Sequence, residues 1–271
     1  KERQPFYQDF RTEMENAIAR ATNIRGRMIV DFVPSQSPSD FAAVLEKTAA
    51  RADALVATAV NHVQVTDTIA RIQDGGTPCF SLLNDFAQGI RQSYIGVNNM
   101  KAGRVAAHMI MKAIQRPGKL GVFVGGFRWH GHELRETGFR SYFREFGPDY
   151  SVLDTLVNLE TRQLTYEATL ELLQRHPDLK GLYYAGGGME GAIAALRDAR
   201  APGQVALVVH EITPESRAAL ADRYAEMVIA TPLRQLCEAA VKLVSDTVLN
   251  GTSGTPGQLF LRPDLYLPES V

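Results

Sequence analysis

Short apolar runs alternate with amphipathic segments along almost the whole chain. Seven of these runs are continuous and rich in Val, Ile, Leu and Tyr, which is typical of strands buried on both faces of a parallel sheet. They cover residues 28–33, 54–58, 78–83, 120–125, 182–185, 205–209 and 227–230. The pattern therefore predicts a sheet structure that is mainly parallel.

Between the predicted strands, apolar residues recur every three or four positions, as in amphipathic helices. Ser39 and Asp40 precede one such segment, and Thr213 with Pro214 begins another, which are typical helix starts. Nine helices are predicted, over residues 10–21, 41–50, 65–73, 102–114, 134–146, 166–174, 190–197, 214–221 and 233–249. This alternation implies right-handed β–α–β units and an α/β fold. Near the end, we predict a loop over 250–257 and a short extended segment over 259–267.

The first residues do not follow this alternation. A helix begins near Phe6 with no strand before it. An α/β lobe normally opens with a strand that lies near the middle of its sheet. We therefore expect this stretch of sequence to start one strand late.

Composition narrows the class of protein. The chain has 271 residues, of which 45% are hydrophobic and 22% charged, so it fits one large globular domain or two lobes of about 100–150 residues. Its net charge of −1, with no basic run, does not suggest a DNA-contacting surface. We expect no membrane span, because no run of about 18 apolar residues occurs. No signal peptide opens the chain.

Cysteine and histidine patterns give only weak chemical signals. Cys79 and Cys237 lie in apolar patterns, so we expect core thiols and no disulfide or metal pair. His130 and His132 lie two apart with no third ligand, so we expect residues rimming a cleft and no metal. His210 and Glu211 form a possible acid–base pair. No nucleophile motif accompanies them, so we expect neither an enzyme nor a cofactor.

Polar and aromatic residues follow the predicted strand ends, where open parallel sheets bind ligands. They are Asn84, Asp85, Phe127, Arg128, Trp129, His130, Gly186, Gly187, Gly188, His210, Glu211 and Thr231. Aromatic faces can cover the apolar faces of a sugar, and planar polar groups can bond its hydroxyls. The set therefore favours a polyhydroxylated ligand, although each residue alone is equally consistent with an ordinary loop.

Five segments, in order, resemble one family along nearly the whole chain. They are Gln4-Pro5-Phe6-Tyr7, Ile95–Asn99 followed by Ala102-Gly103-Arg104-Val105-Ala106-Ala107, Arg135-Glu136-Thr137-Gly138-Phe139, Val209-His210-Glu211-Ile212-Thr213-Pro214, and a tail from Leu261 to Pro268. Together they are similar to type 1 periplasmic sugar-binding proteins and, in the tail, to LacI-type transcriptional regulators. The resemblance implies two Rossmann-like lobes joined by a hinge. The first lobe would comprise residues 1–97 and 232–252, and the second residues 98–231 and 253–271.

The resemblance also implies ligand contacts in the cleft between the lobes. Phe6 and Tyr7 would stack on the ligand, Gln4 would hydrogen-bond it, and Arg135 would bridge two hydroxyls or a carboxylate. Further expected contacts are Asn84, Trp129, Glu160, Gly186, Glu211 and Thr231. The chain departs from the family at Gly186-Gly187, where the family has Asn-Asp, and at Thr231, where sugar binders carry Gln. These departures are consistent with a larger ligand, a ligand that approaches the glycine backbone, a substituted sugar or another small polar metabolite.

The resemblance implies the effector domain of a cytoplasmic LacI-type regulator. It would bind a sugar or a similar small molecule, form a homodimer, and contact operator DNA through a head domain outside this chain. The alternative is a periplasmic solute-binding protein of a sugar transporter. A third possibility is a dinucleotide enzyme, because Gly186, Gly188 and Gly191 form a G-x-G-x-x-G followed by Glu211. That motif lies late in the chain, which argues against it.

Overall fold

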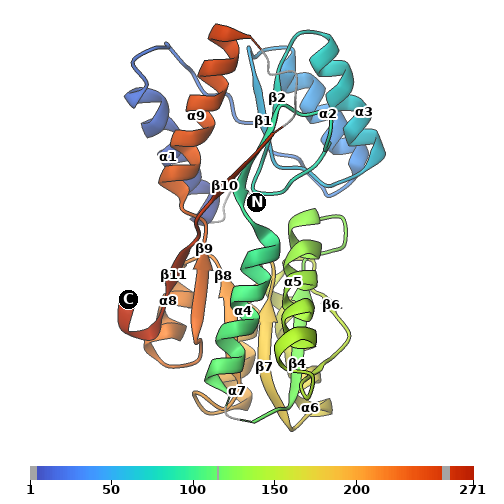
Figure 1. Cartoon of the computed structure of the whole chain (residues 1–271), viewed down its shortest axis with the longest axis vertical. Helices are drawn as coiled ribbons and strands as arrows, with labels where there is room; N and C mark the ends of the chain where they lie inside the picture. Colours follow the sequence, from blue (N-terminus) through green and yellow to red (C-terminus); the bar gives the residue numbers. More distant parts are fainter. Residues whose placement is uncertain (1–4, 115, 252–256) are drawn as a thin grey trace. The chain divides into compact units, whose positions relative to one another are not determined.

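The computed structural model describes residues 5–114, 116–251 and 257–271. The chain divides into two compact units, each described here by itself (Figure 1). The first unit contains residues 1–97, 128–130 and 231–262, and the second contains residues 98–127, 131–230 and 263–271. Both units are α/β, as the sequence predicts. No helix in the described ranges is long and apolar enough to cross a membrane.

The first unit is built on a four-stranded parallel sheet. Its order is β1 (Leu55–Ala57), β2 (Cys79–Leu82), β3 (Ser93–Val97) and β10 (Gly257–Leu261). Alternate side chains of β2 enter different cores. Cys79 packs with helices α2 (Pro38–Ala49) and α3 (Val63–Asp74), whereas Phe80 packs with α1 (Pro5–Arg20) and α9 (Leu233–Asn250). The sheet therefore lies between two helix pairs.

The second unit is built on a seven-stranded sheet. Its order is β11 (Asp264–Tyr266), β9 (Met227–Ala230), β8 (Ala206–His210), β7 (Leu179–Tyr184), β4 (Lys119–Val124) and β5 (Ser151–Val152), with β6 (Leu156–Val157) also beside β4. Strand β11 runs antiparallel to β9, and all other pairs are parallel. Tyr183 of β7 enters a core with α4 (Asn99–Ala113) and α5 (His130–Phe146). Its neighbour Tyr184 enters a core with α6 (Arg162–Arg175), α7 (Met189–Ala199) and α8 (Pro214–Ala221). A short 3-10 helix, Pro268–Ser270, follows β11.

Helices α4 and α5 approach each other closely because glycine occupies their crossing point. A Cβ atom at Gly103 would lie 1.9 Å from the carbonyl oxygen of Arg135, and one at Gly138 would lie 2.1 Å from that of Met100. No side chain fits in either place. The contact sets the position of the helix that carries Arg135.

A buried ion pair joins the loop after β2 to the distant strand β10. Arg91 Nε lies 2.6 Å from Asp85 Oδ1, and both side chains are buried. Arg91 also donates to the Gly257 carbonyl at 2.8 Å, and Gln258 donates to Asp85 at 3.1 Å. Burial alone would raise the pKa of Asp85, but the hydrogen bonds and charge of Arg91 outweigh it and lower that pKa. The network fixes β10 against the sheet.

Several elements differ from the sequence prediction. Residues 28–33 form no strand; they are mostly half-exposed, and Asp31 bonds Thr48 and Arg51 of the α2 region instead. Apolar content alone does not make a strand without a hydrogen-bonded neighbour. Ser39 and Asp40 lie inside α2, whose N-cap position is Ser37 and has no side-chain cap hydrogen bond. Thr213 and Pro214 begin α8 as predicted, and Thr213 forms a capping box there. The pattern missed β3.

The last crossing of the chain between the units also differs from the expected one. Residues 257–261 were expected in the second lobe, but β10 pairs with β3, so the chain stays with the first unit through Arg262. Thr231 and residues 128–130 also group with the first unit.

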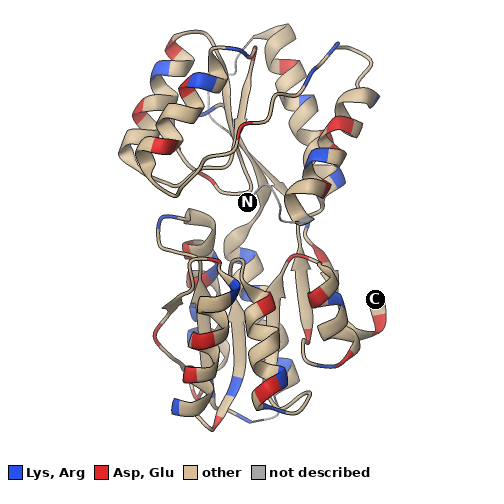
Figure 2. Ribbon diagram, turned by 180° about the vertical axis from the view of Figure 1, so that it is seen from behind, with Lys and Arg blue, Asp and Glu red and all other residues tan. Residues whose placement is uncertain are grey.

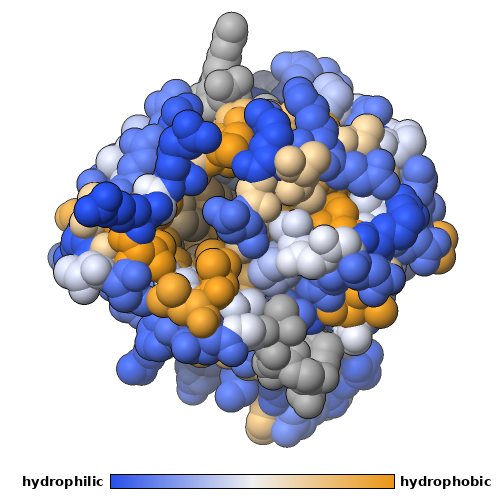
Figure 3. Space-filling model, turned by 90° about the horizontal axis from the view of Figure 1, so that it is seen from above, coloured by the Kyte–Doolittle hydropathy of each residue, from blue (hydrophilic) through white to orange (hydrophobic). Residues whose placement is uncertain are grey.

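The face seen in Figure 3 is mainly hydrophilic, with apolar side chains in small separate groups.

Candidate functional site

Four parallel strands of the second unit end along one edge of its sheet. They are β4, β7, β8 and β9, which end at Val124, Tyr184, His210 and Ala230. Ligands of open parallel sheets bind at such an edge. Four of the predicted ligand residues belong to the loops and helix starts of this unit: Arg135, Glu160, Gly186 and Glu211.

Arg135 is fixed at this edge by two hydrogen bonds. Its Nε atom donates to Asn99 Oδ1 at 2.7 Å, and its Nη1 atom donates to the Ala185 carbonyl at 2.8 Å. Asn99 begins α4, and Ala185 directly follows β7. The guanidinium is thus held between two elements. Its Nη2 atom has no hydrogen bond within the described residues, so this group can donate to a ligand oxygen.

His132 and Glu160 face each other at the same edge. His132 Nε2 lies 3.7 Å from Glu160 Oε1, and their side chains are only 12% and 16% exposed. The Gly125 N–H donates to His132 Nδ1 at 3.2 Å, and the Gly187 N–H donates to Glu160 Oε1 at 3.3 Å. Backbone groups from two strand ends therefore hold both side chains.

The backbone is strained at two acidic residues of this unit. Glu160 has a φ of 57° and Glu211 a φ of 66°, a region that residues other than glycine rarely adopt. Asn158 Oδ1 accepts the Glu160 N–H at 2.9 Å, and the Glu211 N–H donates to the Ile229 carbonyl at 3.0 Å. Leu159 and Arg223 of the same unit also have positive φ, so this strain does not by itself assign a binding role to the two acids.

A neutral histidine lies beneath this edge. His210 Nε2 and the Tyr183 hydroxyl are 2.8 Å apart, and both residues are buried. Burial, together with the charges of Arg135 and His132, holds the pKa of His210 well below its ordinary value. Burial also raises the pKa of Tyr183. The two side chains are therefore fixed in place and uncharged. A buried neutral His210 does not support the possible acid–base pair with Glu211.

Packing within the unit accounts for the glycine run after β7. A Cβ at Gly186 would lie 2.5 Å from His132, and one at Gly191 would lie 2.1 Å from the Arg162 carbonyl. Gly188 has a φ of 87°, and its Cβ would lie 2.4 Å from Thr165. Each glycine is therefore required by its neighbours, without a bound dinucleotide.

The remaining predicted ligand residues belong to the first unit or lie outside the described residues. Phe6 and Tyr7 begin α1, their rings meet edge to face at 5.3 Å, and Tyr7 also contacts Phe32. Gln4 lies outside the described residues. Thr231 follows β9. The ligand contacts expected of Phe6, Tyr7, Gln4 and Thr231 stay predictions.

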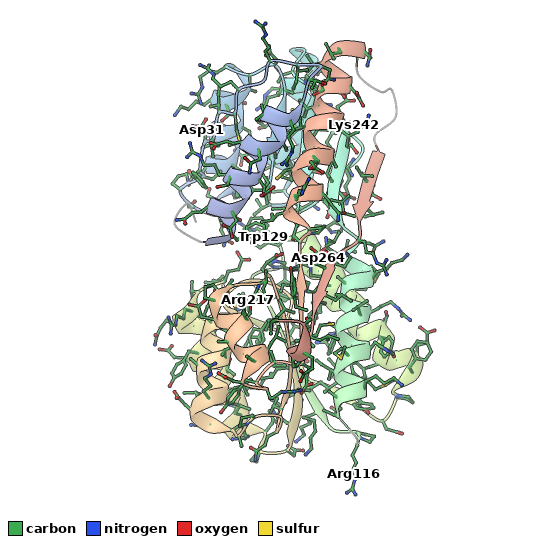
Figure 4. All side chains as sticks on the ribbon, turned by 90° about the vertical axis from the view of Figure 1, so that its left-hand side faces the viewer. Asp31, Arg116, Trp129, Arg217, Lys242 and Asp264 are labelled. Atoms are coloured by element: carbon green, nitrogen blue, oxygen red, sulfur yellow. The ribbon has the colours of Figure 1, made fainter. Side chains whose placement is uncertain are left out.

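Two expected contacts point into the first unit. Trp129, which is labelled in Figure 4, is 7% exposed, and its ring lies edge to face with that of Phe41 in the core beside α2. Asn84 is 6% exposed and donates its amide to the Ala59 carbonyl at 2.6 Å. Both side chains therefore have a packing role that sequence position after a strand did not reveal.

His132 is a site residue that the strand-end argument did not select. It lies three positions before Arg135 on α5, so the two share one helix face. The spacing of three residues between His132 and Arg135 is the sequence signal that could have identified His132. In the sequence analysis, His132 is considered only together with His130, as a weak metal-binding pattern.

The chain matches the family described as periplasmic binding protein domain over residues 4–252. It therefore belongs to this family, whose members are binding proteins and not enzymes. A comparison with curated proteins found no match.

Solved structures share the fold. An ABC transporter solute-binding protein from Burkholderia graminis, in complex with D-arabinose, is 18% identical with a TM-score of 0.90, covering 98% of this chain and 92% of that one. One from Agrobacterium vitis, bound with α-D-tagatopyranose, is 20% identical with a TM-score of 0.88, covering 98% and 91%. GanP, a glucose-galactose binding protein from Geobacillus stearothermophilus, is 15% identical with a TM-score of 0.85, covering 99% and 95%.

Proposed function

We propose that this chain is a solute-binding protein that takes a monosaccharide for a membrane transporter. The observation that carries the proposal is Arg135, held by two hydrogen bonds at the sheet edge that also carries Glu160. A fixed cation and a carboxylate can together bond several hydroxyls of one sugar. Family membership and the sugars named for the three structural neighbours support the same ligand class.

The neighbours favour a transporter protein over the effector domain of a LacI-type regulator. The regulator hypothesis rests on the resemblance of the Ala102–Ala107 and Leu261–Pro268 segments. The expected operator DNA, homodimer and cytoplasmic location all depend on that hypothesis. In the ribbon of Figure 2, lysine and arginine positions alternate with aspartate and glutamate positions along the elements of both units. An extracytoplasmic location accordingly replaces the cytoplasmic one in this proposal.

Coding sequence upstream of Lys1 separates these two functions. A secretory signal supports the solute-binding protein, whereas a helix-turn-helix segment supports the regulator. Sedimentation of the purified protein adds a second criterion, because the regulator is expected to be a dimer.

Calorimetric titration with D-arabinose, D-tagatose, D-glucose and D-galactose tests the ligand class. We expect at least one of the four to bind. Arg135→Lys should then weaken binding about 10–100-fold, because a lysine cannot reproduce the planar fork. Arg144→Lys is the matched control, since Arg144 lies exposed on the last turn of α5. Unchanged affinity in Arg135→Lys contradicts the site, and failure of all four sugars contradicts the ligand class.

A further inference from the structure

Residues 28–33 of the first unit direct their side chains alternately to its two layers of helices, as a strand does. The Phe32 ring lies 6.4 Å from that of Tyr7 on α1. The neighbouring Asp31 points the other way and accepts a hydrogen bond of 2.7 Å from Thr48 of α2. The segment is therefore extended in line with the sheet, although it pairs with no strand of the described residues.

Strand β1 contributes to the same two cores as this segment. Val56 and Met28 both pack against the core of α1 and α9, and Ala57 and Val33 both pack against the core of α2 and α3. Two extended segments thus lie between the same helix layers without a hydrogen-bonded ladder between them.

The outer side of β1 offers backbone groups to a further strand. Within the described residues, β1 is an edge of its sheet and pairs only with β2. The Leu55 N–H donates to the Pro78 carbonyl at 2.9 Å on the β2 side. Successive residues of a strand direct their N–H and C=O groups to opposite sides, so those of Val56 point away from β2. A strand placed there gains a donor and an acceptor.

The handedness of β–α–β connections gives the position of a strand that precedes α1. Such connections are right-handed, so the face on which a helix lies sets the direction in which the next strand is added. Helices α2 and α3 lie on one face of the sheet and α1 on the other (Figure 1). The step through α3 leads from β1 to β2, so the step through α2 places residues 28–33 beyond the outer side of β1. The step through α1 runs the opposite way, so a strand before α1 lies on the β1 side of residues 28–33.

We propose that a strand encoded upstream of Lys1 inserts between residues 28–33 and β1, parallel to both. About five apolar residues suffice, as in the buried strand β3. The strand would bond Val56 on one side and residues 28–33 on the other, and it would cover Val30 and Phe32, which are each 37% exposed.

The insertion also has a consequence for ligand binding by the first unit. The inserted strand and β1 would be neighbours whose following helices, α1 and α3, lie on opposite faces. Such a pair forms the topological switch point at which open α/β sheets bind ligands. The insertion itself does not depend on the sugar-binding function proposed above.

Hydrogen exchange compares residues 1–271 with the same chain extended by the ten or so residues that its gene encodes before Lys1. In the extended chain, we expect the Val56 amide and alternate amides of residues 28–33 to exchange about 100-fold more slowly. A general gain in stability cannot protect an amide that still has no acceptor. The matched control is the same extension with proline at two alternate positions, which cannot donate to a ladder and should give no protection. Val122 of β4, in the second unit, is the reference amide.

Each other outcome overturns the proposal. Unchanged exchange at Val56 means that the upstream residues do not occupy this edge, and protection confined to β10 means that they pair at the opposite edge. Protection of Val56 in residues 1–271 that is lost on dilution means that a second copy covers the edge. Should the extended chain not fold, a synthetic peptide of the same upstream sequence, added to residues 1–271, gives the same readout.

Discussion

The substitution Gly103→Ala, at the crossing of α4 and α5, changes stability through two opposing effects: helix propensity and close packing. Helix propensity alone predicts a gain of about 1 kcal/mol, because alanine is the best helix former and glycine is a poor one. The structure predicts a loss, because the new methyl group would lie 1.9 Å from the Arg135 carbonyl oxygen. Real Cβ contacts are essentially never shorter than 3.0 Å, so the helices must separate by about 1 Å.

Forced overpacking of this kind costs about 1–3 kcal/mol, and a backbone atom cannot rotate away as a side chain can. We expect a net loss of about 1 kcal/mol after the propensity gain of about 1 kcal/mol is subtracted, seen as a lower urea midpoint with an unchanged slope. The same shift stretches the 2.7 Å bond from Arg135 to Asn99, so sugar affinity should fall too. Lys101→Ala, on the exposed side of α4, is the control and should change stability by a few tenths of a kcal/mol. A stability gain in Gly103→Ala would refute the argument from close packing.

Three further predictions follow from buried groups. Asp85→Asn should cost about 3 kcal/mol in urea unfolding at pH 7, because it leaves Arg91 buried without its partner. The pKa of Asp85 is lower in the folded chain than its unfolded value of about 4. The ionised carboxylate therefore stabilises the fold above about pH 4, and this stabilisation is lost as the pH falls further. Asp85→Asn should lack this part of the acid dependence of the unfolding free energy. Trp129→Ala should cost about 3–5 kcal/mol, and since Trp129 is the single tryptophan, its fluorescence in the folded chain should resist quenching by acrylamide; ready quenching would contradict its burial. Burial raises the pKa of Cys79 and of Cys237 to about 12, so neither thiol should react with a disulfide reagent at about pH 8 until urea unfolds the chain.

Hydrophobic patterning predicted most of the elements because buried parallel strands and amphipathic helices have distinct periods. Hydrophobic patterning failed where contacts between distant parts of the chain determine the secondary structure. Residues 28–33 have the composition of a strand but no neighbouring strand among the described residues. Strand β3 was missed because Ser93 and Gly96 interrupt its apolar run, although all five of its residues are buried.

The strand-end argument indicates which loops lie at the edge of the sheet, but it does not indicate the direction of their side chains. Arg135 and Glu160 lie at the expected edge, while Asn84 and Trp129 turn inward to a carbonyl group and a core. A sequence gives the position of a polar residue after a strand. Whether its side chain is used for packing depends on neighbours far away in the chain, such as Phe41 for Trp129.

Strand β10 has a consequence for the order of folding during synthesis. It pairs with β3, although more than 150 residues separate Val97 from Gly257, and the entire parallel part of the second sheet lies between them. A ribosome therefore releases nearly all of the second unit while the first still lacks an edge strand and the partners of the Asp85–Arg91 pair. The first unit therefore gains its edge strand only after most of the second unit has been synthesised, and limited proteolysis of nascent chains halted before Gly257 should find the first unit cleaved while the second is largely protected.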